Sequence, residues 1–330
     1  MKNRSILIMG GLTVLLFALA LGMQLGGGGD EAASKSGTKL LGRIKPEEIG
    51  KIVLEKGSEK TSLLRSSDGY RVEEKWEYEA DGMKVDALLV RLLGLKGSEW
   101  ITSRADRLDT LGLSDKAPGR EGVTFFDPAG RELGALIIGG SRKGGASSYR
   151  YVKNRAEDDI FLATVSGTID ADPLRWIEKS LLQIPSSELE RVDLRHPLKR
   201  DDFSIIGKED GSFEAEGVKK VKGKGFKESV INNAAGAMKN MTIRDIMKRG
   251  SEEAKGLNFD HSYVAELKDG RVYEISSASR EGKNWLTIDV SFKGEGPDEK
   301  AMKEKERLEP WIFEVAGADS FRYRASDLIE

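Results

Sequence analysis

The residue types that most often carry chemistry are sparse in this chain. Histidine occurs only at His196 and His261, and cysteine is absent. The run Asp260-His261-Ser262 holds the residue types of a serine-hydrolase triad, but a triad depends on spatial arrangement, and no G-x-S-x-G motif accompanies it. No H-E-x-x-H pattern offers clustered metal ligands either. We therefore predict no catalytic residue, no metal site and no cofactor, and expect a protein that is not an enzyme.

One dense basic run lies at residues 218–227, with the sequence VKKVKGKGFK. Its glycines lack the G-x-x-x-x-G-K-[S/T] spacing of a phosphate-binding loop, so they indicate a turn. The lysines are candidate contacts for an anion or a partner, and the alternative is a solvated loop that leads into a helix. These candidate residues are Lys219, Lys220, Lys222, Lys224 and Lys227.

The overall charge gives no field that would attract nucleic acid. The 330 residues include 53 basic and 55 acidic side chains, for a net charge of −2. The composition is 38% hydrophobic and 33% charged, which is typical of a well-solvated globular chain that folds. We expect two or three domains, partners that are recognised locally, and no nucleic-acid partner.

An apolar run at the N-terminus predicts a single membrane-spanning helix. Residues 6–25 carry no charge, and their number matches the roughly 20 residues that a helix needs to cross the hydrocarbon core. The predicted membrane anchor, residues 1–25, would contact the lipid bilayer through this run. Its apolar side chains include Ile6, Leu7, Leu15, Leu16, Phe17, Leu19 and Leu21.

The charges beside this run predict its orientation. Lys2 and Arg4 precede it, and Asp30 and Glu31 follow it, which favours a cytoplasmic N-terminus and a translocated body. We expect a single-pass protein of the cytoplasmic (inner) membrane with its body on the extracytoplasmic, periplasmic side. A signal peptide cleaved after Ala20 is the alternative, and it would export the same body. Residues 26–39 read as a flexible linker.

An internal repeat organises the rest of the chain. The pattern I-x-x-x-E-[I/L]-x-[K/R]-[I/V]-x-L opens at Ile44 and again at Ile184, an offset of 140 residues. Further pairs follow at nearly the same offset. They are Asp68-Gly69 with Asp210-Gly211, Leu111-Gly112-Leu113 with Lys255-Gly256-Leu257, and Ala129-Gly130-Arg131 with Asp269-Gly270-Arg271. We predict two tandem repeat domains, residues 40–183 and 184–330.

Each predicted repeat combines short strands with one main helix. Alternating apolar residues and turn signals predict strands over 49–56, 61–66, 70–74, 122–127, 133–138, 149–153 and 160–163. Helical spacing of apolar residues predicts helices over 81–96 and 226–240. Asp172-Pro173 reads as the start of a further helix over 176–182. The fold class is therefore α+β, with two β-rich, largely antiparallel domains after one transmembrane helix.

The chain resembles the bacterial family known as domain of unknown function 4340. The resemblance rests on the N-terminal span, the repeat opening, the 76–93 strand-to-helix stretch, Leu111-Gly112-Leu113 and the 176–182 segment. It implies an extracytoplasmic component that accompanies ABC transporter subunits of the gliding-motility type. It implies no catalytic residues.

These observations favour a non-enzymatic, membrane-anchored accessory whose partner is an ABC transporter permease or another membrane protein. Two alternatives remain open. One is a hydrolase that acts on cell-envelope polysaccharide or peptide through carboxylates distant in sequence. The other is a pair of domains that binds a ligand between the repeats.

Overall fold

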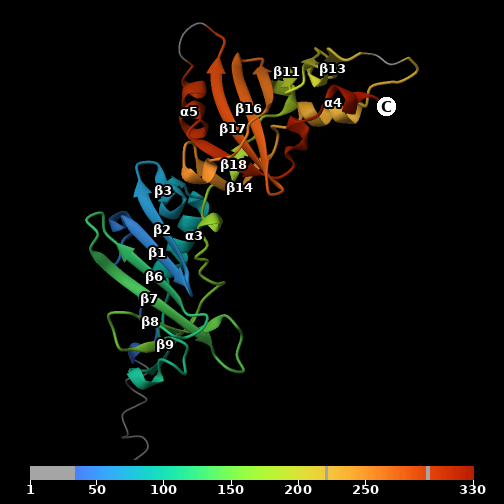
Figure 1. Ribbon diagram of the computed structural model, residues 1–330. Helices are drawn as coiled ribbons and strands as arrows, with labels where there is room; N and C mark the ends of the chain where they lie inside the picture. Colours follow the sequence, from blue (N-terminus) through green and yellow to red (C-terminus); the bar gives the residue numbers. More distant parts are fainter. Residues whose placement is uncertain (1–33, 220–221, 295–297) are drawn as a thin grey trace, which may run out of the picture. The chain divides into compact units, whose positions relative to one another are not determined.

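The computed structural model describes residues 34–219, 222–294 and 298–330. The predicted membrane span, residues 6–25, lies outside these ranges. The chain forms two compact units (Figure 1). The first comprises the residues up to Glu74 together with Gly82–Trp176, and the second comprises Lys75–Asp81 together with Ile177–Glu330. The chain thus enters the second unit briefly, over residues 75–81, before it completes the first.

The first unit is built on an antiparallel sheet in the order β3-β2-β1-β6-β7-β8-β9-β5. Its strands are β1 (Lys51–Lys56), β2 (Glu59–Ser66), β3 (Gly69–Val72), β5 (Glu99–Thr102), β6 (Glu121–Phe126), β7 (Glu132–Ser141), β8 (Tyr149–Asn154) and β9 (Ile160–Thr164). The core begins at β1, where Ile52 is fully buried between Leu63 of β2 and Phe125 of β6.

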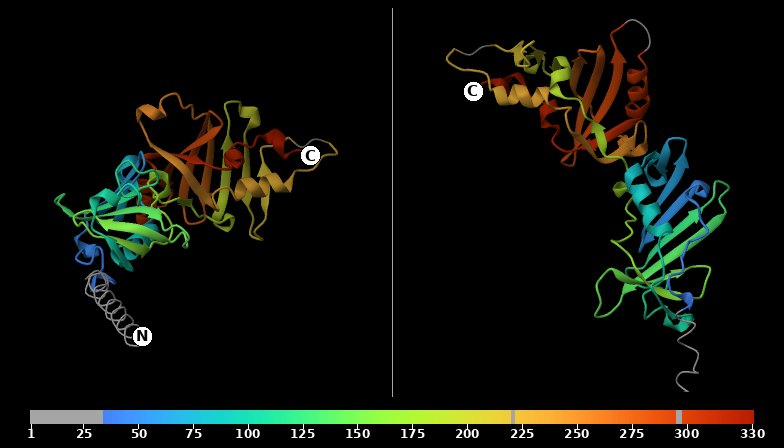
Figure 2. Two further views of the ribbon diagram at one scale, coloured as in Figure 1. Left: turned by 90° about the horizontal axis from the view of Figure 1, so that it is seen from below. Right: turned by 180° about the vertical axis from the view of Figure 1, so that it is seen from behind.

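Helix α3 (Gly82–Leu93) covers one face of this sheet, as the view from behind in Figure 2 shows. Four apolar side chains at helical spacing form its inner face and are buried. They are Val85, Leu88, Leu89 and Leu92. Their burial explains why the sequence pattern predicts the helix correctly.

The second unit is built on an antiparallel sheet in the order β10-β14-β18-β17-β16-β15-β11-β12-β13. Its strands are β10 (Ser180–Leu182), β11 (Leu189–Arg195), β12 (Phe203–Gly207), β13 (Phe213–Glu216), β14 (Met241–Lys248), β15 (His261–Leu267), β16 (Arg271–Arg280), β17 (Lys283–Phe292) and β18 (Trp311–Val315). Helix α4 (Glu228–Ala235) contacts β13, and helix α5 (Glu299–Leu308) packs on β17 (Figure 1). The two-residue β4 (Tyr78–Glu79) lies in the 75–81 segment.

The two sheets share one strand order. The first order becomes the second, read from its β13 end, when β1, β2, β3, β5, β6, β7, β8 and β9 are replaced by β11, β12, β13, β14, β15, β16, β17 and β18. Strand β10 is an additional edge strand of the second sheet. Helices α3 and α4 occupy the same place in the two series. The turns that the repeat pairs in the sequence also match in the structure. Gly130 lies between β6 and β7, Gly270 lies between the corresponding β15 and β16, and both adopt left-handed backbone angles. Helix α5 is an addition to the second unit, between β17 and β18.

The expected α+β architecture with antiparallel sheets is confirmed, but the helix predicted over 176–182 is wrong. Asp172 does accept a hydrogen bond from the Leu174 N–H, yet it caps only a 3₁₀ turn at Pro173–Arg175. The chain then extends as β10, which pairs with β14. Tertiary pairing thus overrides a short helical pattern.

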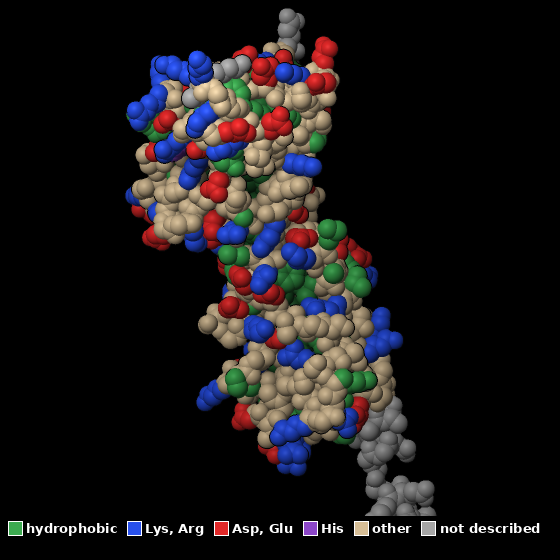
Figure 3. Space-filling model, turned by 90° about the vertical axis from the view of Figure 1, so that its right-hand side faces the viewer, with side chains coloured by type: hydrophobic (Ala, Val, Ile, Leu, Met, Phe, Trp, Pro, Cys, Tyr) green, Lys and Arg blue, Asp and Glu red, His purple; other side chains and the backbone are tan. Residues whose placement is uncertain are grey.

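Basic and acidic side chains are interspersed on the face drawn in Figure 3. This distribution agrees with the small net charge, and recognition must therefore depend on local groups.

Candidate functional site

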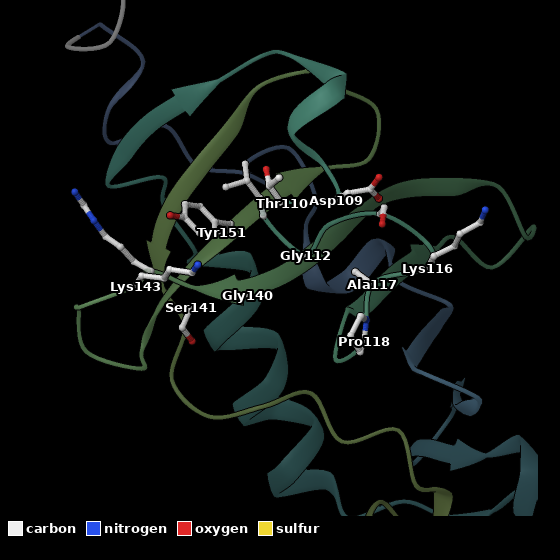
Figure 4. A pocket seen from close by; sticks show the side chains of 13 residues that line it. Asp109, Thr110, Gly112, Lys116, Ala117, Pro118, Gly140, Ser141, Lys143 and Tyr151 are labelled. Atoms are coloured by element: carbon white, nitrogen blue, oxygen red, sulfur yellow. The ribbon is translucent and has the colours of Figure 1, made fainter.

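A pocket of about 650 Å³ opens on the first unit (Figure 4). It lies between the 109–118 segment and the end of β7 with the hairpin loop that follows. Its lining residues are Asp109, Thr110, Leu111, Gly112, Ser114, Lys116, Ala117, Pro118, Gly140, Ser141, Arg142, Lys143 and Tyr151. Pockets of this size commonly hold a small molecule or a few side chains of a partner.

Glycines allow two backbone segments to meet at the floor of the pocket. The Gly140 N–H donates to the Leu111 carbonyl at 2.9 Å. A Cβ atom at position 139 would lie 2.5 Å from that same carbonyl oxygen. Gly112 adopts φ +70°, and a Cβ atom there would lie 2.8 Å from the Gly140 nitrogen. Gly139 is therefore required for close approach, and Gly112 both for close approach and for backbone angle.

An apolar cluster forms one wall beside the pocket. Leu113, Ile137 and Ile160 are buried together, and Leu111 and Tyr151 pack against them. Ile101 and Leu108 complete the cluster. Because Leu111 and Tyr151 also line the pocket, a bound group would contact an aromatic ring and an aliphatic side chain.

The charged side chains that line the pocket are predominantly basic. Lys116 and Lys143 flank it from two sides in Figure 4, and neither forms an ion pair in the part of the chain that the structure describes. Arg142 is paired with Glu99 at 2.7 Å, and Asp109 is the one carboxylate in the lining. The site therefore favours a ligand that combines negative charge with an apolar or aromatic group.

A buried ion pair supports the strand that carries the pocket floor. Arg150 donates to Glu121 at 2.8 Å and to the Gly139 carbonyl at 2.7 and 3.0 Å. Glu121 also accepts a hydrogen bond from the Ile169 N–H at 2.9 Å. Both side chains line a neighbouring cavity of about 380 Å³, which shares Gly140 and Ser141 with the main pocket. Since these groups satisfy one another, we assign them a structural role.

The second unit has a corresponding apolar cluster that contains a residue from outside its sheet. Met247, Trp285 and Ile312 are buried together, and Trp76 of the 75–81 segment packs against them. The Lys75 ammonium pairs with Asp245 at 2.7 Å. The Tyr78 ring meets Trp311 edge-on at 5.0 Å between centroids, and burial raises the pKa of its hydroxyl.

Strand register identifies the two clusters as equivalent places. In the first unit, Tyr151 and Glu99 both lie opposite Leu162 of β9. In the second, Trp285 and Asp245 both lie opposite Glu314 of β18. Tyr151 thus corresponds to Trp285, and Glu99 corresponds to Asp245.

The partners of the two acidic residues differ. Glu99 pairs with Arg142 of the first unit's own hairpin loop, whereas Asp245 pairs with Lys75 of the 75–81 segment. The Leu111 and Lys255 carbonyls also occupy corresponding positions, and each accepts a hydrogen bond from the sheet of its own unit. The donor to Leu111 is the Gly140 N–H, and the donor to Lys255 is the Arg280 guanidinium. The pocket of the first unit therefore adjoins the place that corresponds to the one that Trp76 fills, because Tyr151 lines it.

The 75–81 segment is held in an unusual backbone conformation. Trp76 and Glu77 have φ angles of +53° and +59°, which are rare for residues other than glycine. The backbone carbonyl of Glu79 accepts a hydrogen bond from the Glu178 N–H at 2.9 Å, and Ala80 pairs with Ile177 in an antiparallel bridge. The surrounding contacts offset the backbone strain, so the segment is specifically bound.

The lysines of the predicted basic run do not take part in the pocket. Lys219, Lys222, Lys224 and Lys227 lie at the surface of the second unit, and Lys220 lies outside the described residues. The Lys227 N–H donates to the Leu328 carbonyl, which ties this end of the run to the C-terminal segment. The predicted anchor residues Ile6, Leu7, Leu15, Leu16, Phe17, Leu19 and Leu21 also lie outside the described residues.

The structure brings the two histidines together, which their sequence contexts do not suggest. The rings of His196 and His261 meet edge-on at 5.2 Å between centroids. His261 contacts Asp260 at 2.5 Å, and the His196 Nε2 lies 3.3 Å from the Arg322 carbonyl. Within the described ranges, no group of three or more His, Asp or Glu side chains is placed to hold a metal ion.

Sequence reasoning missed the pocket because its charged residues are distant in sequence. The paired L-G-L and K-G-L motifs were visible, as were the consecutive glycines at 139 and 140. Both signals mark close backbone approach, but neither identifies its partner without the strand order.

Among the described residues, no helix is long and apolar enough to cross a membrane. No curated protein and no solved structure matches the chain. The family model described as domain of unknown function (DUF4340) matches residues 70–261. This range is more than half of the chain, and it includes the 75–81 segment and the pocket floor. The chain therefore belongs to the DUF4340 family.

Proposed function

We propose that this protein is a non-enzymatic accessory, anchored in the cytoplasmic membrane, whose extracytoplasmic body binds a polypeptide partner. The partner in this proposal is the permease of an ABC transporter of the gliding-motility or export type. Residues 1–25 act as the anchor and residues 26–39 as the tether. The run from 6 to 25 supports the anchor because it carries no charge over a full membrane span.

One observation carries the binding role: the second unit holds the short 75–81 stretch of chain through side-chain contacts. Trp76 inserts into an apolar cluster, Lys75 forms an ion pair and Tyr78 meets an aromatic ring edge-on. An apolar anchor with polar contacts around it is how many domains recognise peptides. The fold is therefore suited to binding a short polypeptide segment.

We further propose that the two units arose by duplication of one domain. The matching strand orders and the matching positions of α3 and α4 support this origin. A duplicated peptide-binding domain would provide two equivalent sites, one filled by the chain itself and one available to a partner.

Purification of the full-length protein from detergent-solubilised membranes of its native host tests the proposal. We expect ABC permease and ATPase subunits to co-purify, and we expect this recovery to be lost when residues 1–25 are deleted. A matched control replaces residues 6–25 with an unrelated membrane-spanning helix, which should restore membrane association. Recovery of no membrane partner, or turnover of an envelope substrate by the purified body, would contradict the proposed function.

A further inference from the structure

We infer that the pocket at 109–118 and 140–143 binds a short segment of a partner protein that carries an aromatic side chain beside carboxylates. This inference rests on the proposed function, since it takes the partner to be a polypeptide. It adds the location of the binding site and the chemistry of the bound segment.

The second unit shows how this fold binds such a segment. Trp76 packs on Trp285, Met247 and Ile312, while the adjacent ammonium of Lys75 pairs with Asp245. In the first unit Tyr151 occupies the position of Trp285 and Ile160 lies in the corresponding cluster. The apolar contact surface is thus retained, and about 650 Å³ remains open beside it.

The charges of the two places differ in a way that indicates the ligand. In the second unit a basic residue of the bound segment meets the acidic Asp245. In the first unit Arg142 already neutralises the corresponding Glu99. Lys116 and Lys143 then add positive charge that no carboxylate of the described residues pairs with. An acidic segment is therefore favoured at the first site.

The segment that the second unit binds also illustrates the required composition. Residues 75–81 read KWEYEAD, with three carboxylates, one lysine and two large aromatic side chains, and two further glutamates precede them in the sequence. A segment of this kind would place an aromatic ring against Tyr151 and Leu111, and carboxylates near Lys116 and Lys143. The ring supplies the apolar contact, and the carboxylates supply the charge pairing.

A second copy of this chain is a poor source for the bound segment. The stretch of the second unit that corresponds to 75–81 lies between β13 and α4, at residues 217–227. This stretch is the basic run, with lysines at 219, 220, 222, 224 and 227. Like charges would oppose its entry into a basic pocket. Residues 75–81 of a second copy are already held by that copy's own second unit. We therefore take the ligand to be a segment of a different protein.

Fluorescence anisotropy with the full-length protein in detergent tests this inference. The probe is a fluorescein-labelled peptide with the sequence of residues 73–81. We expect saturable binding that weakens with added salt, as for exposed charge pairs. The double substitution Lys116→Glu and Lys143→Glu should weaken binding by about tenfold or more, because two attractive contacts become repulsive. A peptide with alanine in place of its tryptophan should also bind more weakly.

The matched control is Lys222→Glu with Lys224→Glu, which makes the same charge change at the exposed basic run. We expect this variant to bind the peptide as the wild type does. Absence of binding to the wild type would overturn the inference. Loss of binding in the control alone would overturn it too, because the basic run would then be the site. Binding of an acidic oligosaccharide at the pocket lysines without peptide binding would likewise overturn it.

The same variants separate this inference from the proposed function. If membrane partners co-purify equally with the wild type and with the Lys116→Glu, Lys143→Glu variant, the accessory role stands and the pocket assignment fails. If the peptide binds at the pocket but no membrane partner is recovered, the pocket assignment stands and the accessory role fails.

Discussion

The guanidinium of Arg150 is buried, and it donates to the Glu121 carboxylate and to the Gly139 carbonyl. Removing one member of a buried ion pair leaves the other charge without compensation. We expect Arg150→Met to lower the free energy of unfolding by about 3–5 kcal/mol. Urea unfolding followed by tryptophan fluorescence measures this change.

The control for this prediction is the double variant Arg150→Met with Glu121→Gln, which removes both charges. The introduced glutamine amide would keep an oxygen that can accept from the Ile169 N–H, so the double variant should be more stable than the single one. A double variant as unstable as Arg150→Met alone would show that the ion pair is not the source of the effect.

Two adjacent glycines of the pocket floor provide a second prediction at the residue scale. A Cβ atom at Gly139 would lie 2.5 Å from the Leu111 carbonyl oxygen, whereas one at Gly140 would lie 3.5 Å away. We expect Gly139→Ala to destabilise the first unit by about 1–3 kcal/mol, because backbone atoms must move. Gly140→Ala should cost less than about 0.5 kcal/mol. Thermal unfolding of the two variants makes the comparison, and equal losses would contradict the proposed close approach.

The proposed binding role depends on the 75–81 segment, and the backbone strain of this segment can be tested. Glu77 is exposed with φ +59°, so Glu77→Gly should stabilise the protein by about 0.5–1 kcal/mol. Trp76 has a similar φ of +53°, but its indole packs in the apolar cluster. Trp76→Gly should therefore destabilise by about 2 kcal/mol or more, despite the same relief of strain. Denaturant midpoints report both changes, and two stabilising substitutions would refute the packing of Trp76.

Local sequence patterns predict elements well where one face is buried. The apolar stripe of α3 and the alternation in β3 are such cases, because periodicity follows directly from burial on one side. The helix expected over 176–182 failed because Leu181 and Leu182 are buried in a strand that pairs with β14. That pairing joins Ser180 to Thr242, and a local pattern cannot show a partner so distant in sequence.

The candidate site was less predictable than the fold for the same reason. Its floor joins Leu111 to Gly140, and its aromatic wall comes from Tyr151 on another strand. The sequence shows the glycines and the repeat, from which a shared place in two equivalent units can be expected. It does not show that Trp76 packs into the apolar cluster of the second unit and not into that of the first. Long-range strand order decides this point.

At the scale of the whole molecule, the division of the chain predicts how the second unit can be isolated. Ala80 and Ile177 pair in an antiparallel bridge, so the chain ends left by removing residues 82–176 lie close together. A protein that joins Asp81 to Ile177 through a short Gly-Ser linker, with residues 75–81 and 177–330, should fold as one cooperative unit. A protein of residues 177–330 alone lacks Trp76, Tyr78 and the Lys75 ion pair. Its free energy of unfolding should be lower by about 3 kcal/mol or more, since a large aromatic anchor is missing.

Urea unfolding and limited proteolysis distinguish these two proteins. The matched control carries residues 75–81 with Trp76→Ala and Tyr78→Ala, which keeps the linker and the chain length but removes the aromatic contacts. We expect it to resemble the protein that lacks the segment. If all three proteins were equally stable, residues 75–81 would add nothing to the second unit. The peptide-binding role would then lose the observation that carries it, because that role depends on the segment being held by its contacts.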